Sequence, residues 1–489
     1  MLQKAVFAVV ILFINLSFTQ VQSSSSCENT KLANAPQIER FQFTPDGNHL
    51  IYAAGHLYKA SLNGENPPIQ ISGDDENRIG FFTFTPDYNQ IVYVNAFQHV
   101  FITQYEASIS QPLNPNQTLN QGISELTITP DSRHIIYRTS FELYSVPIDG
   151  SSDPVMLNNP VPGNPIGNVE VSPDSRSILY AANENRPAYD LYKVPIDRSS
   201  EPTNLTIGLP DILSVDFVEF SPDNQHITFT ARERQGLTSD TYTMPLDGTD
   251  IPKKIEPLKT GVVIPDGRYI INIVYDDKIY KLQKMSVTDN SPPVTLDQSL
   301  PGSIINRFKI SPDGTYVIYD KYGHNASNLY SVLVDGSKSP VLLDGNFPSD
   351  GGVLGFYYGK VTTDSKQVVY ISDREGEESY SLTSVAIDGS TSPVILDDNI
   401  FIDDNNSFDT FLLTNNHHIL YRIQDRKINV IDLYGIPLYG GLPIKINNDL
   451  PPNSFVFQYN FSPNTNYIVY TVEGGKDTEL YSAYCPFQS

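Results

Sequence analysis

The sequence predicts an all-β fold, a β-propeller of about ten four-stranded blades, on the basis of three observations. The 489-residue chain is rich in Tyr, Phe, Pro and Gly and contains no Trp, a composition that favours many short strands and turns. One pattern of strands and turns recurs along nearly the whole chain. Its second-strand markers run from Tyr52 to Tyr470 with a period of about 46 residues, which suits the four strands of one blade.

Each repeat contains an alternating strand, a Ser/Thr-Pro-Asp turn, a second strand ending in Tyr, a third strand with Leu-Tyr, an Asp-Gly turn and a short fourth strand. The clearest copy runs from Leu126 to Leu157. Proline fixes φ and Asp bonds back to its own backbone, so this pair predicts a turn, while Asp-Gly predicts a hairpin. The second strand is almost wholly apolar, which predicts burial on both faces. The copies of the first turn are Pro45-Asp46, Pro86-Asp87, Pro130-Asp131, Pro173-Asp174, Pro222-Asp223, Pro265-Asp266 and Pro312-Asp313, with degenerate copies at Thr363-Asp364, Thr414-Asn415 and Pro463-Asn464.

This pattern resembles the TolB-type propeller repeat, which is related to WD repeats and to the propellers of some serine peptidases. The resemblance is carried by the Ser/Thr-Pro-Asp-Gly turn, the Ile-x-Tyr strand, the Leu-Tyr-x-Val strand and the Asp-Gly turn, and Ile371 to Gly376 is similar to that family's second-hairpin loop. It implies a propeller without a hydrolase domain, since the chain has no Gly-x-Ser-x-Gly motif. The fold says little about function, because propellers host many unrelated activities.

The N-terminal residues are typical of a signal peptide. Lys4 provides the positive start, Ala5 to Phe13 is an apolar run, and cleavage is expected near Ser23. We therefore expect a signal peptide at 1–23, an N-terminal closing strand at 24–40 and a TolB-like propeller at 41–489. The protein would be secreted, or periplasmic if bacterial, without insertion into a membrane. A lipid-anchored Cys27 is a weaker alternative.

The repeat phase leaves the last blade one strand short. That blade ends with its third strand, Glu479 to Tyr484, while Asn29 to Ala35 precedes the first repeat. As in WD-type propellers, we expect this N-terminal segment to pair antiparallel on the outside of the last blade. Cys27 and Cys485 would then form a disulfide, with Cα atoms roughly 4.4–6.8 Å apart. Two tandem five-bladed propellers are the alternative to one ring.

The sixth repeat is the least regular one. Gly261 to Leu296 keeps the Pro-Asp-Gly turn, but its first strand lacks the usual alternating apolar pair. We predict a complete but irregular blade here, and no helix longer than about two turns anywhere after residue 38.

The sequence contains no convincing catalytic or metal-binding motif, and we predict no catalytic residues, no cofactor and no metal. The formal net charge of −24 argues against nucleic-acid partners. His49, His134, His226 and His418 lie near one repeat position, which repeat consensus explains better than a shared metal site, because equivalent residues of different blades lie far apart. Calcium at the acidic stretch Asp397 to Asn405 is a weaker alternative, since the EF-hand spacing is absent.

Five Asn-x-Ser/Thr triplets lie in the mature chain. Asn116, Asn204, Asn325 and Asn405 are candidate glycosylation sites if the source is eukaryotic. Asn460 lies inside a predicted strand and is the least suitable acceptor.

We expect a secreted, non-enzymatic, monomeric binding or interaction module that recognises a protein, peptide or glycan. The alternative is an extracellular propeller enzyme, a polysaccharide lyase or hydrolase with its site at the channel mouth. A mouth lined by aromatic and amide groups would favour binding. A tight cluster of carboxylates or histidines would favour the enzyme.

Overall fold

The computed structural model describes residues 27–487 except 74–77, 106–109, 118–121, 185–188, 210–211, 222–224, 234–238, 256–260, 265–267, 287–290, 324–325, 346–351, 354–358, 374–379, 399, 401–410, 415–416 and 426. The expected signal peptide at 1–23, Asn325 and Asn405 lie outside the described residues. Within them, the regular elements are β-strands and no helix occurs, which agrees with the all-β prediction.

The first five repeats each form one antiparallel sheet in which four strands pair in chain order. Repeat 1 consists of β2 (Arg40–Phe43), β3 (His49–Ala54), β4 (His56–Ser61) and β5 (Ile69–Gln70); repeat 2 of β6 (Ile79–Phe84), β7 (Ile91–Asn95), β8 (Val100–Thr103) and β9 (Ser110–Pro112); repeat 3 of β10 (Glu125–Ile128), β11 (His134–Arg138), β12 (Leu143–Pro147) and β13 (Val155–Met156); repeat 4 of β14 (Val169–Val171), β15 (Ser177–Ala182), β16 (Asp190–Pro195) and β17 (Thr203–Asn204); and repeat 5 of β18 (Ile212–Phe220), β19 (His226–Glu233), β20 (Ser239–Pro245) and β21 (Lys253–Ile255).

The later repeats follow the same order, with an extra strand in repeat 8. Repeat 6 consists of β22 (Gly261–Val263), β23 (Tyr269–Asp276), β24 (Ile279–Ser286) and β25 (Val294–Gln298); repeat 7 of β26 (Ile304–Ile310), β27 (Tyr316–Gly323), β28 (Ala326–Leu333) and β29 (Val341–Leu342); repeat 8 of β30 (Gly352–Val353), β31 (Lys360–Val361), β32 (Gln367–Asp373), β33 (Tyr380–Ala386) and β34 (Val394–Asp397); repeat 9 of β35 (Phe411–Leu413), β36 (His418–Asp425), β37 (Val430–Pro437) and β38 (Ile444–Lys445); and repeat 10 of β39 (Phe455–Phe461), β40 (Tyr467–Glu473) and β41 (Thr478–Tyr484).

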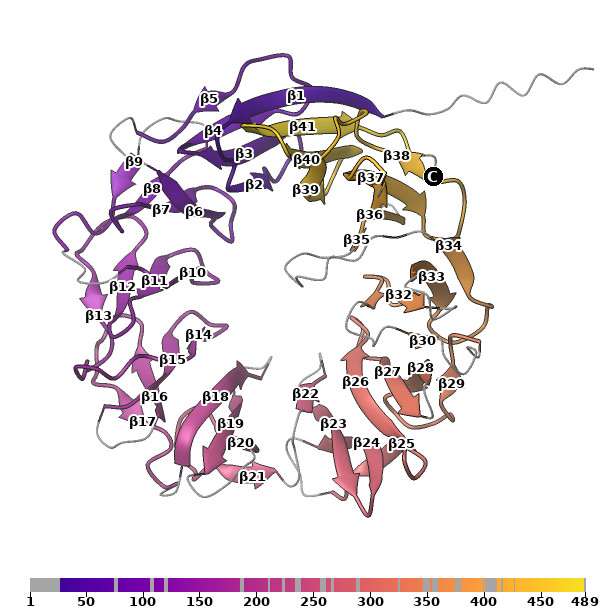
Figure 1. Ribbon diagram of the computed structural model, residues 1–489. Coiled ribbons are helices and arrows are strands. Elements are labelled where there is room, and N and C mark those ends of the chain that lie inside the picture. The colour runs from indigo at the N-terminus through magenta and orange to yellow at the C-terminus, as the bar shows by residue number, and fades with distance from the viewer. Residues whose placement is uncertain are drawn as a thin grey trace, which may run out of the picture.

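The irregular sixth repeat is a complete four-stranded sheet, as predicted, with a register shift between Leu282 and Gln283. Repeats 9 and 10 share one eight-stranded sheet because a single parallel pair, Ile431 with Phe455, links them. Figure 1 shows the sheets placed one after another around an open centre, with β2, β10 and β14 toward the middle and β5 and β13 toward the rim. The arrangement is propeller-like.

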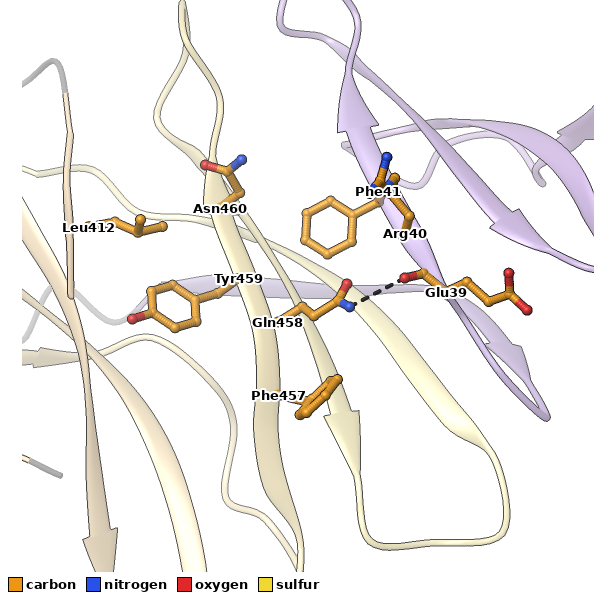
Figure 2. Close-up of a pocket in the computed structure, with 8 residues that line it drawn as sticks. All are labelled: Glu39, Arg40, Phe41, Leu412, Phe457, Gln458, Tyr459 and Asn460. Atoms are coloured by element: carbon orange, nitrogen blue, oxygen red, sulfur yellow. Dashed lines mark hydrogen bonds between the residues drawn. The ribbon is translucent and has the colours of Figure 1, made fainter. Parts of the chain in front are cut away.

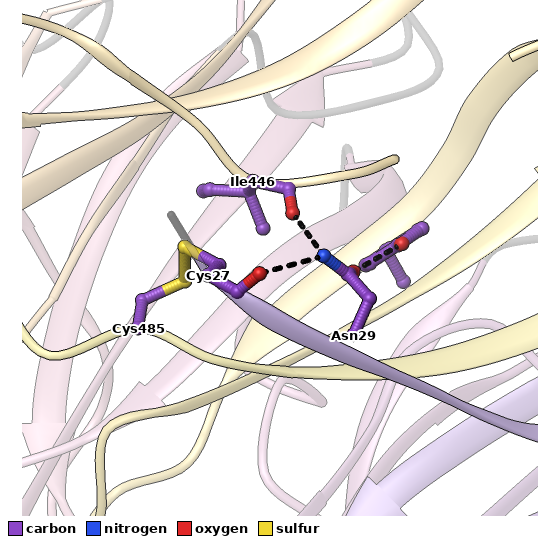
Figure 3. The surroundings of a disulfide bond; sticks show 5 residues. Cys27, Asn29, Ile446 and Cys485 are labelled. Atoms are coloured by element: carbon purple, nitrogen blue, oxygen red, sulfur yellow. Dashed lines mark hydrogen bonds between the residues drawn. A yellow bond between two sulfur atoms is a disulfide. The ribbon is translucent and has the colours of Figure 1, made fainter. Parts of the chain in front are cut away.

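The strand β1 (Glu28–Ala35) completes the sheet of repeat 10, as the repeat phase predicted. It pairs antiparallel with β41 from Glu28 opposite Tyr484 to Ala35 opposite Thr478. Cys27 and Cys485 form a disulfide with their Cα atoms 4.4 Å apart. Asn29 lies beside this bond, where its Nδ2 donates to the carbonyls of Cys27 at 3.2 Å and of Ile446 at 2.8 Å (Figure 3). The first and last described strands are therefore joined both covalently and by strand pairing.

The core is divided among the interfaces between consecutive repeats. The second strands are buried on both faces, as expected from their apolar sequences; Leu50, Ile51 and Ala53 of β3, for example, are fully buried. An aromatic residue of the second strand stacks on one from the third strand, as Tyr52 does on Tyr58 with ring centroids 5.3 Å apart. Such pairs add to the stabilisation from burial alone.

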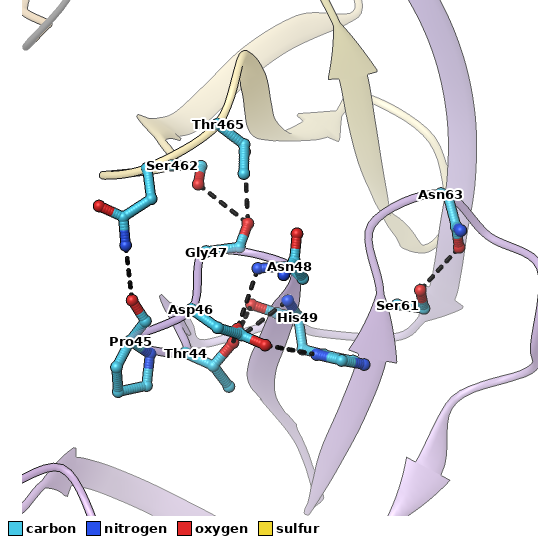
Figure 4. A network of polar contacts seen from close by, with 11 residues as sticks. Thr44, Pro45, Asp46, Gly47, Asn48, His49, Ser61, Asn63, Ser462 and Thr465 are labelled. Carbon is cyan, nitrogen blue, oxygen red and sulfur yellow. Dashed lines mark hydrogen bonds and ion pairs between the residues drawn. The ribbon is translucent and has the colours of Figure 1, made fainter.

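The Ser/Thr-Pro-Asp turns have a recurring set of hydrogen bonds. In repeat 1, Thr44 Oγ1 donates to the carboxylate of Asp46 at 2.5 Å, and the carboxylate accepts from the amide of Asn48 at 3.0 Å (Figure 4). The amide of His49 donates to Thr44 Oγ1 at 3.1 Å. These bonds satisfy the backbone at the start of the second strand, which explains why each repeat uses the same residue types.

Candidate functional site

Three adjoining pockets lie along the first strands of repeats 9, 10, 1, 2 and 3, and we call them together the inner-strand pockets. The first has a volume of about 400 Å³ and lies between β2 and β39, with Leu412 of β35 at its far side (Figure 2). The second has a volume of about 590 Å³ and the third about 630 Å³. Neighbouring pockets share lining residues: Asn460 lines the first and second, and Phe81 and Leu126 line the second and third.

Aromatic and amide side chains contribute to the lining of these pockets, together with aliphatic residues and the charged residues Glu39, Arg40, Arg78 and Glu125. The aromatic side chains include Phe41, Phe43, Phe81, Tyr88, Phe457 and Tyr459, and the amides include Gln42, Gln98, Gln458 and Asn460. Aromatic faces with a small number of polar groups are the usual composition of a ligand-binding site.

Polar contacts hold several of these side chains in place. Gln458 Nε2 donates to the carbonyl of Glu39 at 3.3 Å, which links β39 to the segment that precedes β2 (Figure 2). The guanidinium of Arg40 lies 4.8 Å from the ring centroid of Phe81, within the range of a cation–π contact. Arg78 forms an ion pair with Glu39 at 3.4 Å. The pocket walls therefore belong to different repeats that are bonded to one another.

The first strands of repeats 3, 4 and 5 carry exposed carboxylates: Glu125 lines the third pocket, and Glu170 and Glu219 follow in the next two repeats. Partial burial, together with the carboxylates of Glu125 and Glu219, raises the pKa of Glu170 above its usual value. Glu125 is itself paired with Arg138 at 2.6 Å. The first strands of repeats 3, 4 and 5 therefore form an acidic surface next to the aromatic and amide side chains of the inner-strand pockets.

The turn carboxylates are used within their own turns. The pKa of Asp87 is lowered, chiefly because the hydroxyl of Thr85 donates to its carboxylate. The same Ser or Thr to Asp bond occurs at Asp131, Asp174, Asp313 and Asp364. These contacts explain the repeated Asp as a structural residue.

The turns also bond across the interfaces between repeats. Ser132 of repeat 3 accepts from the backbone amide of Asp87 in repeat 2 at 3.0 Å. Its φ is 58°, an uncommon left-handed conformation that directs the hydroxyl toward the preceding repeat. Between repeats 10 and 1, the hydroxyl of Ser462 donates to the carbonyl of Gly47 at 2.9 Å (Figure 4).

The candidate glycosylation sites differ in their surroundings. Asn116 is exposed in a turn. Asn204 is half-buried at the end of β17, and its amide nitrogen donates to Asp190 at 3.0 Å. Asn460 lies inside β39, as expected, and is exposed. Glycosylation itself stays a prediction; Asn116 and Asn460 are exposed, and Asn204 is not.

The four candidate histidines do not converge on one site, and the calcium candidate lies largely outside the described residues, which include only Asp397, Asp398 and Ile400 of that stretch. His49, His134, His226 and His418 each begin the second strand of a different repeat. Asp397, the first residue of the acidic stretch, accepts a hydrogen bond from Tyr421 at 2.5 Å. In the part of the chain that the structure describes, no group of three or more His, Cys, Asp or Glu residues is placed to hold a metal ion. Likewise, no helix there is long and apolar enough to cross a membrane.

Comparisons with known proteins assign no family to this chain. No family model and no curated protein sequence matches the chain. Among solved structures, a eukaryotic initiation factor has a TM-score of 0.47 and 12% identity, with 73% of this chain and 87% of that chain covered. Dipeptidyl peptidase 4 of Porphyromonas gingivalis has a TM-score of 0.41 and 11% identity, with 90% and 56% covered. A prolyl endopeptidase structure has a TM-score of 0.38 and 12% identity, with 66% and 50% covered. The chain thus spans about half the length of the two peptidases.

Sequence reasoning missed the inner-strand pockets. They are built from strands more than 400 residues apart in the sequence, such as β2 and β39. Aromatic residues in alternating strands are ordinary core residues by pattern alone, so only the arrangement of the repeats reveals them as a shared lining.

Proposed function

We propose that this protein is an exported, non-enzymatic binding module whose ligand, a peptide, protein or glycan, binds in the inner-strand pockets. The observation that supports this proposal is the group of aromatic and amide side chains in the lining of the pockets along β39, β2, β6 and β10. Flat aromatic faces contact apolar surfaces of a ligand, and amides pair with its hydroxyl or peptide groups without requiring a fixed charge.

We further propose that the ten repeats are the blades of one TolB-like propeller closed by β1. Two features support a single ring over two tandem rings of five blades. An apolar cluster that includes Phe41, Leu50, Val469 and Leu480 joins repeats 10 and 1. In tandem rings repeat 1 would instead pack against repeat 5, and the pairing of β1 with β41 would have no place.

Arrays of immobilised glycans and peptides probed with the mature protein provide the test. The variant Phe81→Ala, Tyr459→Ala should lose binding by about tenfold or more, because both rings line the inner-strand pockets. Tyr439→Ala is the matched control, since Tyr439 is an exposed aromatic outside these pockets and its loss should leave binding unchanged.

Two results would contradict the proposal. Equal loss of binding in the pocket variant and the Tyr439→Ala control would mean that the ligand binds elsewhere. Release of shortened oligosaccharides from a polysaccharide incubated with the protein would favour the alternative of a lyase or hydrolase.

A further inference from the structure

The interfaces between consecutive repeats, which we call seams, are apolar with one exception. Nine clusters of buried apolar residues each join two consecutive repeats around the structure. Among the described residues, no such cluster spans repeats 5 and 6. The internal repeat allows each position of this seam, seam 5/6, to be compared with nine equivalents.

The face of repeat 5 directed at repeat 6 carries hydroxyls where the other repeats carry aliphatic side chains. By strand register, the second-strand residue is Thr228 and the third-strand residue is Thr241. The equivalents of Thr228 are Ile51, Val92, Ile136, Leu179, Ile271, Ile318, Val369, Leu420 and Val469. The equivalents of Thr241 are Leu57, Val100, Leu143, Leu191, Leu282, Leu329, Leu382, Leu433 and Leu480.

The opposing face of repeat 6 departs from the pattern at the position that packs on the preceding repeat. Asn272 lies there, opposite Gln283 on the third strand. Asn272 is fully buried and Thr241 is 5% exposed, so seam 5/6 is closed in this structure. The equivalents of Asn272 are all aromatic: Tyr52, Tyr93, Tyr137, Tyr180, Phe229, Tyr319, Tyr370, Tyr421 and Tyr470.

At one third-strand position, a hydroxyl bonds across the seam in repeats 7, 8 and 10 but not in repeats 3 and 5. Ser331, Ser384 and Ser482 each donate across a seam to a backbone carbonyl of the next repeat, at 2.6, 2.7 and 2.5 Å. Thr243 occupies the same register position, but its hydroxyl donates to Ile227 within its own sheet at 3.1 Å. Repeat 5 therefore lacks this cross-seam bond as well as the apolar contacts.

We propose that the ring opens at seam 5/6 and that this opening controls the access of bulky ligands to the inner-strand pockets. Separating an apolar interface exposes hydrocarbon to water, whereas exposed Thr, Asn and Gln side chains form hydrogen bonds with water. Seam 5/6 is thus the interface with the lowest cost of separation. It lies across the ring from the disulfide-linked strands β1 and β41 (Figure 1), so those strands hold the two halves together while seam 5/6 parts. The access step rests on the proposed function.

Thiol labelling of the ligand-free protein tests the opening. The two native cysteines are bonded to each other, so a new thiol is the only reactive one. Thr241→Cys places it in seam 5/6, and Leu329→Cys places it at the equivalent position of the apolar seam between repeats 7 and 8. Under native conditions, a poly(ethylene glycol) maleimide should label Thr241→Cys about tenfold faster than Leu329→Cys. The cavity left by Leu329→Cys speeds the labelling of the control. This bias reduces the expected difference in labelling rate, so a difference that remains supports the proposal.

An apolar repair of the seam provides the second arm. Adding Thr228→Val and Gln283→Leu to Thr241→Cys should slow its labelling several-fold, because these changes bring seam 5/6 closer to the other nine. Equal labelling rates for Thr241→Cys and Leu329→Cys would overturn the proposal. So would labelling of Thr241→Cys by iodoacetamide but not by the larger maleimide, since that result would indicate a local fluctuation rather than an open seam.

These outcomes are separate from those of the arrays. A protein that binds no glycan or peptide can still show rapid labelling at seam 5/6, which would contradict the proposed function and leave the opening intact. Slow labelling combined with binding in the inner-strand pockets would contradict only the opening.

Discussion

Two seams on opposite sides of the propeller-like arrangement solve the same packing problem in different ways. Seam 10/1, between repeats 10 and 1, joins the two ends of the described chain through a disulfide, the β1–β41 pairing and an apolar cluster. Seam 5/6 is crossed by the continuous chain, and its facing side chains at Thr228, Thr241, Asn272 and Gln283 are polar. The chain crosses both seams, from Ala35 of β1 to Arg40 of β2 and from repeat 5 to repeat 6, but among the described residues only seam 10/1 also has an apolar cluster.

The difference teaches that the repeats are not equivalent in energy although they are equivalent in topology. Each of the other nine seams contributes hydrophobic stabilisation at the same register positions, and seam 5/6 forgoes it. If the whole ring were under selection only for stability, the repeat consensus would be the simplest solution at every seam. The polar residues of seam 5/6 fit the opening proposed above.

The largest expected effect comes from removing the disulfide that ties β1 to the end of repeat 10. Cys27→Ser with Cys485→Ser should lower the free energy of unfolding by roughly 2–5 kcal/mol, because the bond constrains an unfolded chain with a sequence separation of 458 residues. Denaturant unfolding measures the loss, and far-UV circular dichroism should show unchanged sheets. An unchanged unfolding midpoint would mean that strand pairing alone holds β1 on the sheet of repeat 10.

Exchanging the equivalent residues of the two seams should change the free energy of unfolding in opposite directions and by unequal amounts. Leu480 is fully buried in the cluster at seam 10/1, so Leu480→Thr should lower the free energy of unfolding by roughly 2–5 kcal/mol. The reverse change at the equivalent position, Thr241→Leu, should alter it by about 1 kcal/mol or less, in the stabilising direction. Thermal unfolding of both variants tests the pair, and similar losses in both would show that seam 5/6 tolerates no larger side chain.

Acidification should destabilise the whole ring through the turn carboxylates rather than through seam 5/6. The pKa of Asp87 is lowered by the Thr85 hydroxyl, and that of Glu479 by its bond to Lys31 across β1 and β41. A group with a lowered folded pKa contributes stability above its unfolded pKa and loses it as the pH falls through the folded value. Glu170, Asp320 and Glu473, whose pKa values are raised, act in the opposite direction.

Among the described residues, more carboxyl groups have a lowered pKa than a raised pKa. The Tm should therefore fall by roughly 5–10 °C between pH 5 and pH 3. Differential scanning calorimetry across this range gives the measurement. The Asp87→Asn variant should show a smaller fall than the parent, because it removes one of the titrating groups. A Tm that is constant or rises toward pH 3 would contradict this account.

The smallest expected effect distinguishes the two third-strand hydroxyls. Ser482→Ala removes the buried donor to the carbonyl of Leu62 across seam 10/1 and should lower the free energy of unfolding by about 1 kcal/mol. Thr243→Ser keeps a hydroxyl in repeat 5 and should have a smaller effect. The bond goes to the backbone carbonyl of Leu62, and Leu62→Ala leaves that carbonyl in place. A double-mutant cycle of Ser482→Ala with Leu62→Ala should therefore show little coupling, and strong coupling would reveal a contribution from the Leu62 side chain.

Local signals predicted the strands and turns well because each repeat satisfies its own hydrogen bonds. The Thr44-Pro45-Asp46 turn forms the contacts within itself that its residue types predict, although repeat 10 adds hydrogen bonds to Pro45 and Gly47. The disulfide between Cys27 and Cys485 was also predictable, because the repeat phase places both ends at one edge. The pockets were not, since Arg40 and Phe81 become neighbours only when β2 and β6 lie side by side.

The sequence by itself determined the repeat, the order of pairing within each sheet and the place of the N-terminal strand, because period-two alternation, Pro-Asp turns and Asp-Gly hairpins act over a few residues. Tertiary structure alone decided which face of each sheet meets which neighbour. Thr241 and Asn272 are unremarkable strand residues in the sequence, and they become a polar seam only because register directs both into the same interface. The inner-strand pockets arise for the same physical reason, since the side chains that line them are held together by packing between repeats and not by proximity along the chain.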